Sequence, residues 1–238
     1  MKSYELSYRL GTKNFKGYVV EPKNIQPNTP VVLIVHMWSG RVEFVENKAK
    51  QMAEKGYIGF AIDMYGDGKI GQSINENTQL MQPFIDDRSL MQSHVQAGFL
   101  AVKLIDNANI NKVVAMGYCF GGLCVQDLAR VNVSVAGVIS IHGLMLAPDN
   151  IDHGKFKAKV LILNGANDPM VSDGHWFKLR DELNYAKCDW QKHDFGGVMH
   201  AFTNPHANDK SMGTVFNQSA NIRSEKLIDD FIVECVND

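Results

Sequence analysis

The sequence predicts a doubly wound α/β fold, in which helices cover both faces of a mostly parallel β-sheet. Two observations lead to this fold class: short, almost entirely apolar runs recur along the chain, and longer segments with helical periodicity separate them. Strands that are buried on both faces of a parallel sheet read as continuous apolar runs rather than as an apolar and polar alternation. The alternation of strand and helix implies right-handed crossovers within one sheet.

The N-terminal segment departs from this pattern and predicts a β-hairpin. Tyr4–Leu10 and Phe15–Val20 alternate between apolar and polar residues, and Gly11–Asn14 lies between them. Three prolines between residues 22 and 30 then mark a loop before the α/β pattern begins.

The remaining strands and helices follow in alternation. The expected strands are five short apolar runs and a more polar sixth: Val31–Val35, Tyr57–Ile62, Val113–Met116, Val135–Ile141, Val160–Leu163 and Cys188–Phe195. The expected helices are Val42–Lys55, Asp86–Ile105, Gly122–Arg130, Val171–Leu183 and Asn221–Val236. In the second helix, large apolar residues recur mostly at three- and four-residue steps, which is typical of a stripe that faces the core.

Length and composition bound the domain organisation. The chain has 238 residues, of which 45% are hydrophobic and 21% charged, enough for one sizeable core without disulfides or a metal. The length alone allows one or two domains. Because no repeat, low-complexity block or linker interrupts the chain after Pro30, we expect a single domain over residues 1–238.

Charge and cysteine content indicate the class of partner and the cellular compartment to expect. The 24 basic and 26 acidic residues give a net charge of −2, which argues against a nucleic-acid partner. The N-terminus lacks an apolar signal core, and no apolar run approaches the length of a membrane span. Four cysteines without a C-x-x-C pair are typical of free thiols in a reducing compartment, so we expect a cytoplasmic protein.

The most informative motif is the stretch Gly117-Tyr118-Cys119-Phe120-Gly121, between an apolar strand and a helix. The pattern G-x-C-x-G in this context is a nucleophile elbow with cysteine in the usual serine position. A Cβ at Gly117 or Gly121 would be expected to crowd a neighbouring strand or helix. The helix N-terminus would favour the Cys119 thiolate, and the Phe120 amide would be one oxyanion donor.

A competing interpretation treats Cys119 as a buried core residue in a glycine-rich turn. Such turns also occur in nucleotide-binding folds, but the glycines here do not match G-x-G-x-x-G. Cys124, five residues further on, is expected to be a core residue rather than a partner of Cys119.

An acid and a histidine follow the cysteine in the order that this kind of fold requires. Asp168 comes just after the apolar run Val160–Leu163, and His200 follows Gly196-Gly197 after the last expected strand. The carboxyl ends of parallel strands meet at one edge of a sheet, so the sequence predicts a site of Cys119, Asp168 and His200.

The other histidines make weaker candidates. His36 and His142 each end a strand, and we assign them structural roles in preference to roles in the cleft. The histidines and carboxylates lack any recognised metal-ligand spacing, so no metal site is expected.

These motifs together resemble the dienelactone hydrolase family of α/β hydrolases, from about Lys16 to the C-terminus. The resemblance rests on segments 117–122, 167–169 and 199–202, and the loop 63–68 supports it. It implies an α/β-hydrolase fold and a Cys-His-Asp triad that cleaves esters or lactones without a cofactor. On this chain the nucleophile is Cys119, the base is His200 and its orienting acid is Asp168. Trp38 aligns with the second oxyanion donor.

Two positions depart from the family pattern. Met37 stands where well-known members carry a glutamate that contacts the thiol. Asn204 stands near the position of an arginine that binds the substrate carboxylate in those members. An anionic lactone would therefore lose its counter-charge here.

The sequence thus predicts an enzyme that hydrolyses a small ester, lactone or thioester through an acyl-enzyme on Cys119. Alternatives are a redox- or electrophile-sensing thiol, a catalytically silent binding protein, or a carbon–halogen hydrolase, against which the cysteine counts. We assign Arg41 and Arg88 to solvated helix faces rather than to an anion site. Six loop residues are expected to line an apolar cleft: Trp38, Tyr65, Tyr118, Phe120, Met170 and Phe202.

Overall fold

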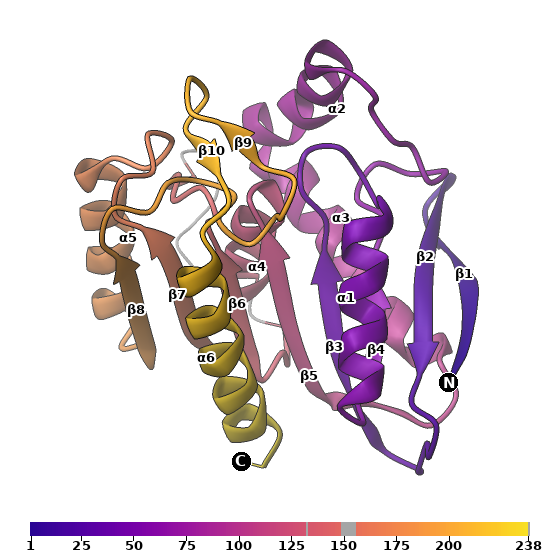
Figure 1. Cartoon of the computed structure of the whole chain (residues 1–238). Coiled ribbons are helices and arrows are strands. Elements are labelled where there is room, and N and C mark those ends of the chain that lie inside the picture. Colours follow the sequence, from indigo (N-terminus) through magenta and orange to yellow (C-terminus); the bar gives the residue numbers. More distant parts are fainter. Residues whose placement is uncertain (132, 149–155, 238) are drawn as a thin grey trace.

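The computed structural model describes residues 1–131, 133–148 and 156–237, and its centre is an eight-stranded sheet (Figure 1). In spatial order the strands are β1 (Lys2–Leu10), β2 (Lys13–Glu21), β4 (Ile58–Ala61), β3 (Thr29–Val35), β5 (Ala108–Tyr118), β6 (Gly137–Ile141), β7 (Lys159–Gly165) and β8 (Trp190–Phe195). β1 pairs with β2, and β2 with β4, in antiparallel fashion, whereas every pairing from β4 to β8 is parallel. The predicted fold class and N-terminal hairpin are confirmed.

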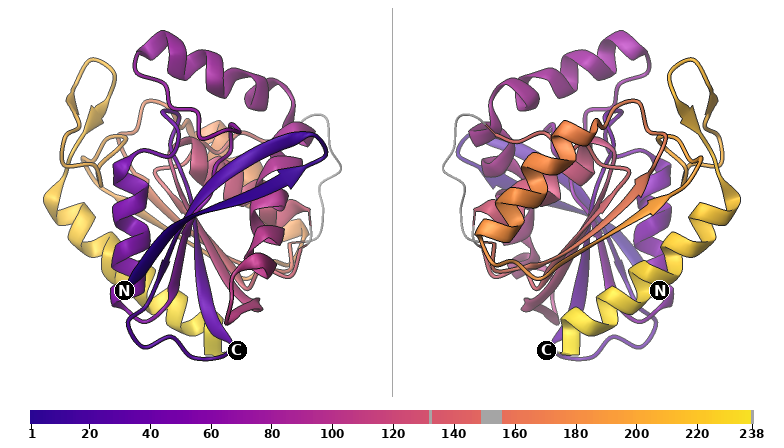
Figure 2. Two further views of the ribbon diagram at one scale, coloured as in Figure 1. Left: turned by 90° about the vertical axis from the view of Figure 1, so that its right-hand side faces the viewer. Right: turned by 90° about the vertical axis from the view of Figure 1, so that its left-hand side faces the viewer.

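The helices cover both faces of the sheet (Figures 1 and 2). α1 (Glu43–Glu54) and α6 (Gln218–Asn237) lie on one face, and α3 (Arg88–Ala101), α4 (Phe120–Arg130) and α5 (Asp173–Tyr185) lie on the other. α2 (Ile74–Asp86) crosses above the carboxyl ends of the strands. No helix within the described part of the chain is both long and apolar enough to cross a membrane.

Alternating side chains of the central strands supply two separate cores. In β3, Val31, Leu33 and Val35 belong to the core beneath α3, α4 and α5. Val32 and Ile34 belong to the core beneath α1 and α6. Because successive residues of a strand point to opposite faces of the sheet, one continuous apolar run contributes side chains to both cores.

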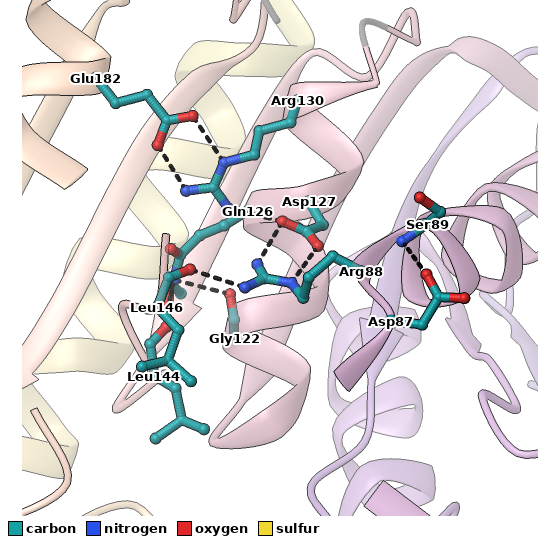
Figure 3. Close-up of polar contacts among 11 residues, drawn as sticks. Asp87, Arg88, Ser89, Gly122, Gln126, Asp127, Arg130, Leu144, Leu146 and Glu182 are labelled. Carbon is teal, nitrogen blue, oxygen red and sulfur yellow. Dashed lines mark hydrogen bonds and ion pairs between the residues drawn. The ribbon is translucent and has the colours of Figure 1, made fainter. Parts of the chain in front are cut away.

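The sequence analysis missed α2 and the short hairpin of β9 (Asn208–Asp209) and β10 (Thr214–Val215). Polar residues interrupt the apolar spacing of α2, and Pro83 lies inside it. Its start nevertheless carries a recognisable signal: Ser73 accepts a hydrogen bond from the Glu76 amide, as in a capping box. The long helix expected from Asp86 begins instead at Arg88, since Asp87 caps it by accepting from the Ser89 amide (Figure 3) and from the Leu90 amide.

A buried ionic network fastens α4 to its neighbours (Figure 3). Arg88 from α3 donates two hydrogen bonds, at 2.6 and 2.7 Å, to the Asp127 carboxylate of α4. Asp127 also accepts a hydrogen bond from Arg130, which forms a bidentate ion pair with Glu182 of α5. A third nitrogen of Arg88 donates to the Leu146 carbonyl at 2.9 Å. The network joins three helices and the loop after β6, so the assignment of Arg88 to a solvated helix face is wrong.

We predict that Asp127→Asn lowers the free energy of unfolding by about 3–5 kcal/mol, because it leaves two buried guanidinium groups without their shared counter-charge. Urea unfolding at neutral pH measures this change. Asp181→Asn is the matched control, since Asp181 pairs with Arg180 on the exposed side of α5 and its removal is expected to change little. An unchanged urea midpoint for Asp127→Asn would contradict the prediction.

Candidate active site

Cys119 lies at a sharp turn between β5 and α4. Its φ of 55° and ψ of −116° place this non-glycine residue in a strained backbone region. The turn is possible because its glycines allow close backbone contact, as the sequence predicts. A Cβ on Gly117 would lie 2.0 Å from the Gly121 carbonyl oxygen, and one on Gly121 would lie 2.3 Å from the Val35 carbonyl oxygen.

The turn presents the Cys119 side chain at the carboxyl end of the sheet. Its amide donates to the Ile141 carbonyl of β6, and its carbonyl accepts from Gly122 in the first turn of α4. Every residue of α4 is buried, whereas Cys119 is partly exposed. Cys119 is therefore a partly exposed residue at the start of a fully buried helix.

Asp168 and His200 come together as the sequence predicts. The Asp168 Oδ2 lies 2.7 Å from His200 Nδ1, and both residues are buried. Asp168 Oδ1 accepts from the Met170 amide at 2.8 Å, which fixes the carboxylate after β7. Hydrogen bonds to the Gly213 carbonyl and from the Val215 amide hold the backbone of His200.

The charge on the His200 ring is set by its neighbours. Burial would lower the pKa of the imidazole, but the nearby Cys119 sulfur and the hydrogen bond to Asp168 outweigh it and raise the pKa to about 10. The second ring nitrogen, Nε2, is buried and forms no hydrogen bond of ordinary geometry with the described residues. His200 therefore carries a proton and a positive charge at neutral pH beside Cys119.

A cavity of about 290 Å³ opens next to Cys119 and His200. Four methionines from separate segments line it: Met37, Met81, Met170 and Met212. Trp38, Phe44 and Leu144 extend its apolar wall, and Asn204 also lies on it. Among the described lining residues, none is a lysine, an arginine or a carboxylate. The cavity therefore suits an uncharged, largely apolar group.

The two expected oxyanion donors are free to act through their backbone amides. Phe120 is the first residue of α4, where an N–H group has no partner within the helix. Neither its amide nor that of Trp38 donates to another backbone or side-chain group in the described residues. Trp38 lines the cavity, whereas the Phe120 side chain is buried in the core.

Only part of the expected apolar cleft is found. Trp38 and Met170 line the cavity, but the side chains of the other four residues pack in the two cores instead: Tyr65, Tyr118, Phe120 and Phe202. Arg41 is also placed differently from the prediction, because it is largely buried in ion pairs with Glu46 and Glu5.

His142 is a site residue to which the sequence analysis gave a structural role. It lines the cavity, and its ring centre lies 5.0 Å from that of His200. Its Nε2 lies 2.9 Å from the Thr203 hydroxyl, another lining group. Burial, followed by the charge of His200, holds the pKa of His142 well below its usual value. A neutral second imidazole therefore adjoins the charged one. His36, in contrast, does not line the cavity, and both of its ring nitrogens contact backbone groups.

The remaining missed residues come from segments without a regular pattern. Met81 lies in α2, and Met212 and Thr214 lie in or next to the β9–β10 hairpin. Across the described ranges, no three histidine, cysteine, aspartate or glutamate side chains are grouped as a metal site requires.

Comparisons with known proteins identify the family and support the fold. Residues 15–233 match the model of the Dienelactone hydrolase family. The chain is similar to the crystal structure of a dienelactone hydrolase-like promiscuous phosphotriesterase from metagenomic libraries, with 25% identity, a TM-score of 0.91 and 98% of each chain covered. It is similar to the structure m3DLH, with 24% identity, a TM-score of 0.94, and 99% and 98% covered. A Yersinia pestis protein assigned as a carboxymethylenebutenolidase is 23% identical over 197 residues, which cover 78% of this chain and 73% of that protein.

The raised pKa of His200 makes stability depend on pH. The folded-state pKa of His200, about 10, exceeds the ordinary value of 6.5, so binding of this proton stabilises the folded state. The stabilisation is fully present below pH 6.5, and it is lost as the pH rises through 10. We predict that Asp168→Asn reduces this loss of unfolding free energy between pH 6.5 and 10. Urea unfolding at several pH values measures it, with Asp181→Asn as a control for the removed charge. A pH dependence in Asp168→Asn equal to that of the unmodified protein would contradict the prediction.

Proposed function

The chain belongs to the dienelactone hydrolase family of the α/β-hydrolase superfamily, and from this membership we propose that it hydrolyses a small uncharged ester or lactone through Cys119, His200 and Asp168. One observation carries the proposal: Cys119, held at positive φ, and the buried His200, hydrogen-bonded to Asp168, line the same apolar cavity. These three residues follow β5, β7 and β8, so the chemistry needs most of the chain. This supports the proposal that residues 1–238 act as one domain.

Acylation begins from the state in which His200 already holds the thiol proton of Cys119, because the ring is charged at neutral pH. The sulfur then attacks the carbonyl carbon, and the electron pair of the carbonyl π bond moves to oxygen. The amides of Phe120 and Trp38 would donate to this oxyanion, which is stronger as an acceptor than the ground-state carbonyl. Collapse of the intermediate restores the carbonyl, while His200 protonates the departing alkoxide. The product of this half-reaction is a thioester on Cys119.

Deacylation uses water as the nucleophile. His200, neutral after acylation, takes a proton from a water molecule as it attacks the thioester; collapse of the intermediate releases the carboxylic acid and the Cys119 thiolate, and the proton stays on His200. Asp168 keeps the Nδ1 proton in place, so that Nε2 faces the reacting groups, and it stabilises the imidazolium.

The cavity supports an uncharged substrate. Apart from His200, whose charge is paired with Asp168, its described lining includes no cationic side chain that could pair with a substrate carboxylate, and Asn204 lies on its wall. Methionine side chains are flexible and polarisable, so this lining can adapt to acyl groups of different shape. A small neutral ester or lactone is therefore a better fit than a dicarboxylate-derived lactone.

We predict that Cys119→Ala lowers kcat for an activated aryl ester by at least about 10⁴-fold, because the acyl-enzyme cannot form. Cys188→Ala, which removes another partly exposed thiol, is the control and should leave kcat unchanged. Mass spectrometry of the quenched reaction should find one acyl group on Cys119.

The outcomes also separate the alternative functions. Full turnover by Cys119→Ala would exclude the mechanism. Stoichiometric modification of Cys119 without turnover would indicate a redox- or electrophile-sensing thiol. The absence of any adduct across esters, lactones and thioesters would indicate a silent binding protein.

We predict that Asn204→Arg improves kcat/KM for an ester with a carboxylate in its acyl group by about 10-fold, since a charged hydrogen bond contributes about 1.5–3 kcal/mol. The neutral counterpart of that ester should not gain. Asn204→Gln keeps the site uncharged and serves as the control. A preference of the unmodified protein for the anionic ester would contradict the proposed substrate class.

A further inference from the structure

Two consecutive carbonyl groups beside the cavity are each held by a buried side chain. His36 Nδ1 lies 2.7 Å from the Met37 carbonyl oxygen, and the Tyr65 hydroxyl donates to the Trp38 carbonyl at 2.7 Å. The Met37 oxygen also accepts from the Gly40 amide at 3.1 Å. The backbone at Met37 and Trp38 is thus restrained from two directions.

The proton position on His36 follows from its second contact. The Met64 amide donates to His36 Nε2 at 3.1 Å, so Nε2 is an acceptor and the proton lies on Nδ1. Nδ1 therefore donates to Met37. Burial lowers the pKa of His36 to about 4, which keeps the ring neutral and this tautomer in place at neutral pH. Both ring nitrogens of His36 therefore form hydrogen bonds with backbone groups.

The geometry of the peptide bond links these contacts to the Trp38 amide. The Met37 carbonyl and the Trp38 N–H belong to one planar peptide, and the described chain has no cis peptide bonds. In a trans peptide the carbonyl and the N–H point in opposite directions. His36 therefore sets the direction of the Trp38 N–H by holding the Met37 oxygen, and Tyr65 fixes the next peptide plane.

The same aromatic side chains contact the residue that carries the other amide. The Tyr65 ring centre lies 4.8 Å from that of His36 and 5.9 Å from that of Phe120, with the latter pair stacked. His36 and Tyr65 are almost fully buried, and neither lines the cavity. One buried cluster therefore contacts the residues of both expected oxyanion donors.

We propose that His36 and Tyr65 are positioning residues that aim the Trp38 amide at the oxyanion formed during attack by Cys119. This inference rests on the proposed function, because it needs a tetrahedral oxyanion. Both side chains act only through the backbone, so they affect the transition state without contacting the substrate.

The test is Tyr65→Phe, which removes one hydroxyl and keeps the ring packing. It should lower kcat for an aryl acetate by about 10-fold with little change in KM, since the donor remains but is less well fixed. The affinity for an aryl trifluoromethyl ketone should fall by a similar factor, because Cys119 adds to its carbonyl to form an oxyanion. Alkylation of Cys119 by iodoacetamide forms no oxyanion, and its rate should stay unchanged.

Tyr8→Phe is the matched control. The Tyr8 hydroxyl donates to the Asp63 carbonyl and accepts from the Asp63 amide, so the variant removes a buried hydroxyl near the loop that carries Tyr65. It should lower Tm and leave affinity for the ketone unchanged. Equal losses of ketone affinity in Tyr8→Phe and Tyr65→Phe would assign the effect to stability alone and overturn the proposal.

Substitutions of His36 provide a second readout. Asn can place its amide nitrogen near the position of Nδ1, whereas Gln places its polar atoms near Nε2. His36→Asn should therefore retain more affinity for the ketone than His36→Gln, and the reverse order would overturn the proposal. An unchanged kcat in Tyr65→Phe overturns this inference alone, whereas full turnover by Cys119→Ala overturns the proposed function as well.

Discussion

The hydrogen bond between Asp168 and His200 is the interaction on which the rest of the site depends. It spans 2.7 Å between two buried side chains. Burial alone would lower the pKa of the imidazole, but the charge of the nearby Cys119 sulfur, together with this hydrogen bond, raises it to about 10. Parallel pairing of β7 and β8 brings the loops after them to one edge of the sheet. Backbone hydrogen bonds then hold the acid at Met170 and the histidine at Gly213, so neither group is free to turn away.

The backbone of Cys119 is also held in place, by the strands and the helix around its turn. Its positive φ is held because β5, β6 and α4 surround the turn, and glycines allow the backbones to approach. The network of Arg88, Asp127 and Arg130 then fastens α4 to its neighbours without a disulfide. Strain at a functional residue persists only where the surrounding structure over-determines it, and here both the packing and the buried charges do so.

Much of this architecture could be predicted from the sequence because its signals are local. The elbow around Cys119, the apolar strands, and the positions of Asp168 and His200 after strands are all visible as short patterns. The rest depends on contacts between distant segments. Arg88 hydrogen-bonds to Asp127, 39 residues away in the sequence. His142, which lines the cavity, contacts the Thr203 hydroxyl, 61 residues away. α2 was missed for another reason: its capping residues Ser73 and Glu76 are recognisable, but its polar composition hides the helical stripe.

The central claim is that Asp168 and Cys119 maintain a buried, charged imidazole at His200. An NMR titration of protein labelled with nitrogen-15 at histidine observes that proton directly. The account predicts that the His200 ring stays protonated through neutral pH and loses its proton near pH 10. Deprotonation near the ordinary value of 6.5 would contradict the account, because the Asp168 hydrogen bond and the Cys119 sulfur would then not control the charge of the ring.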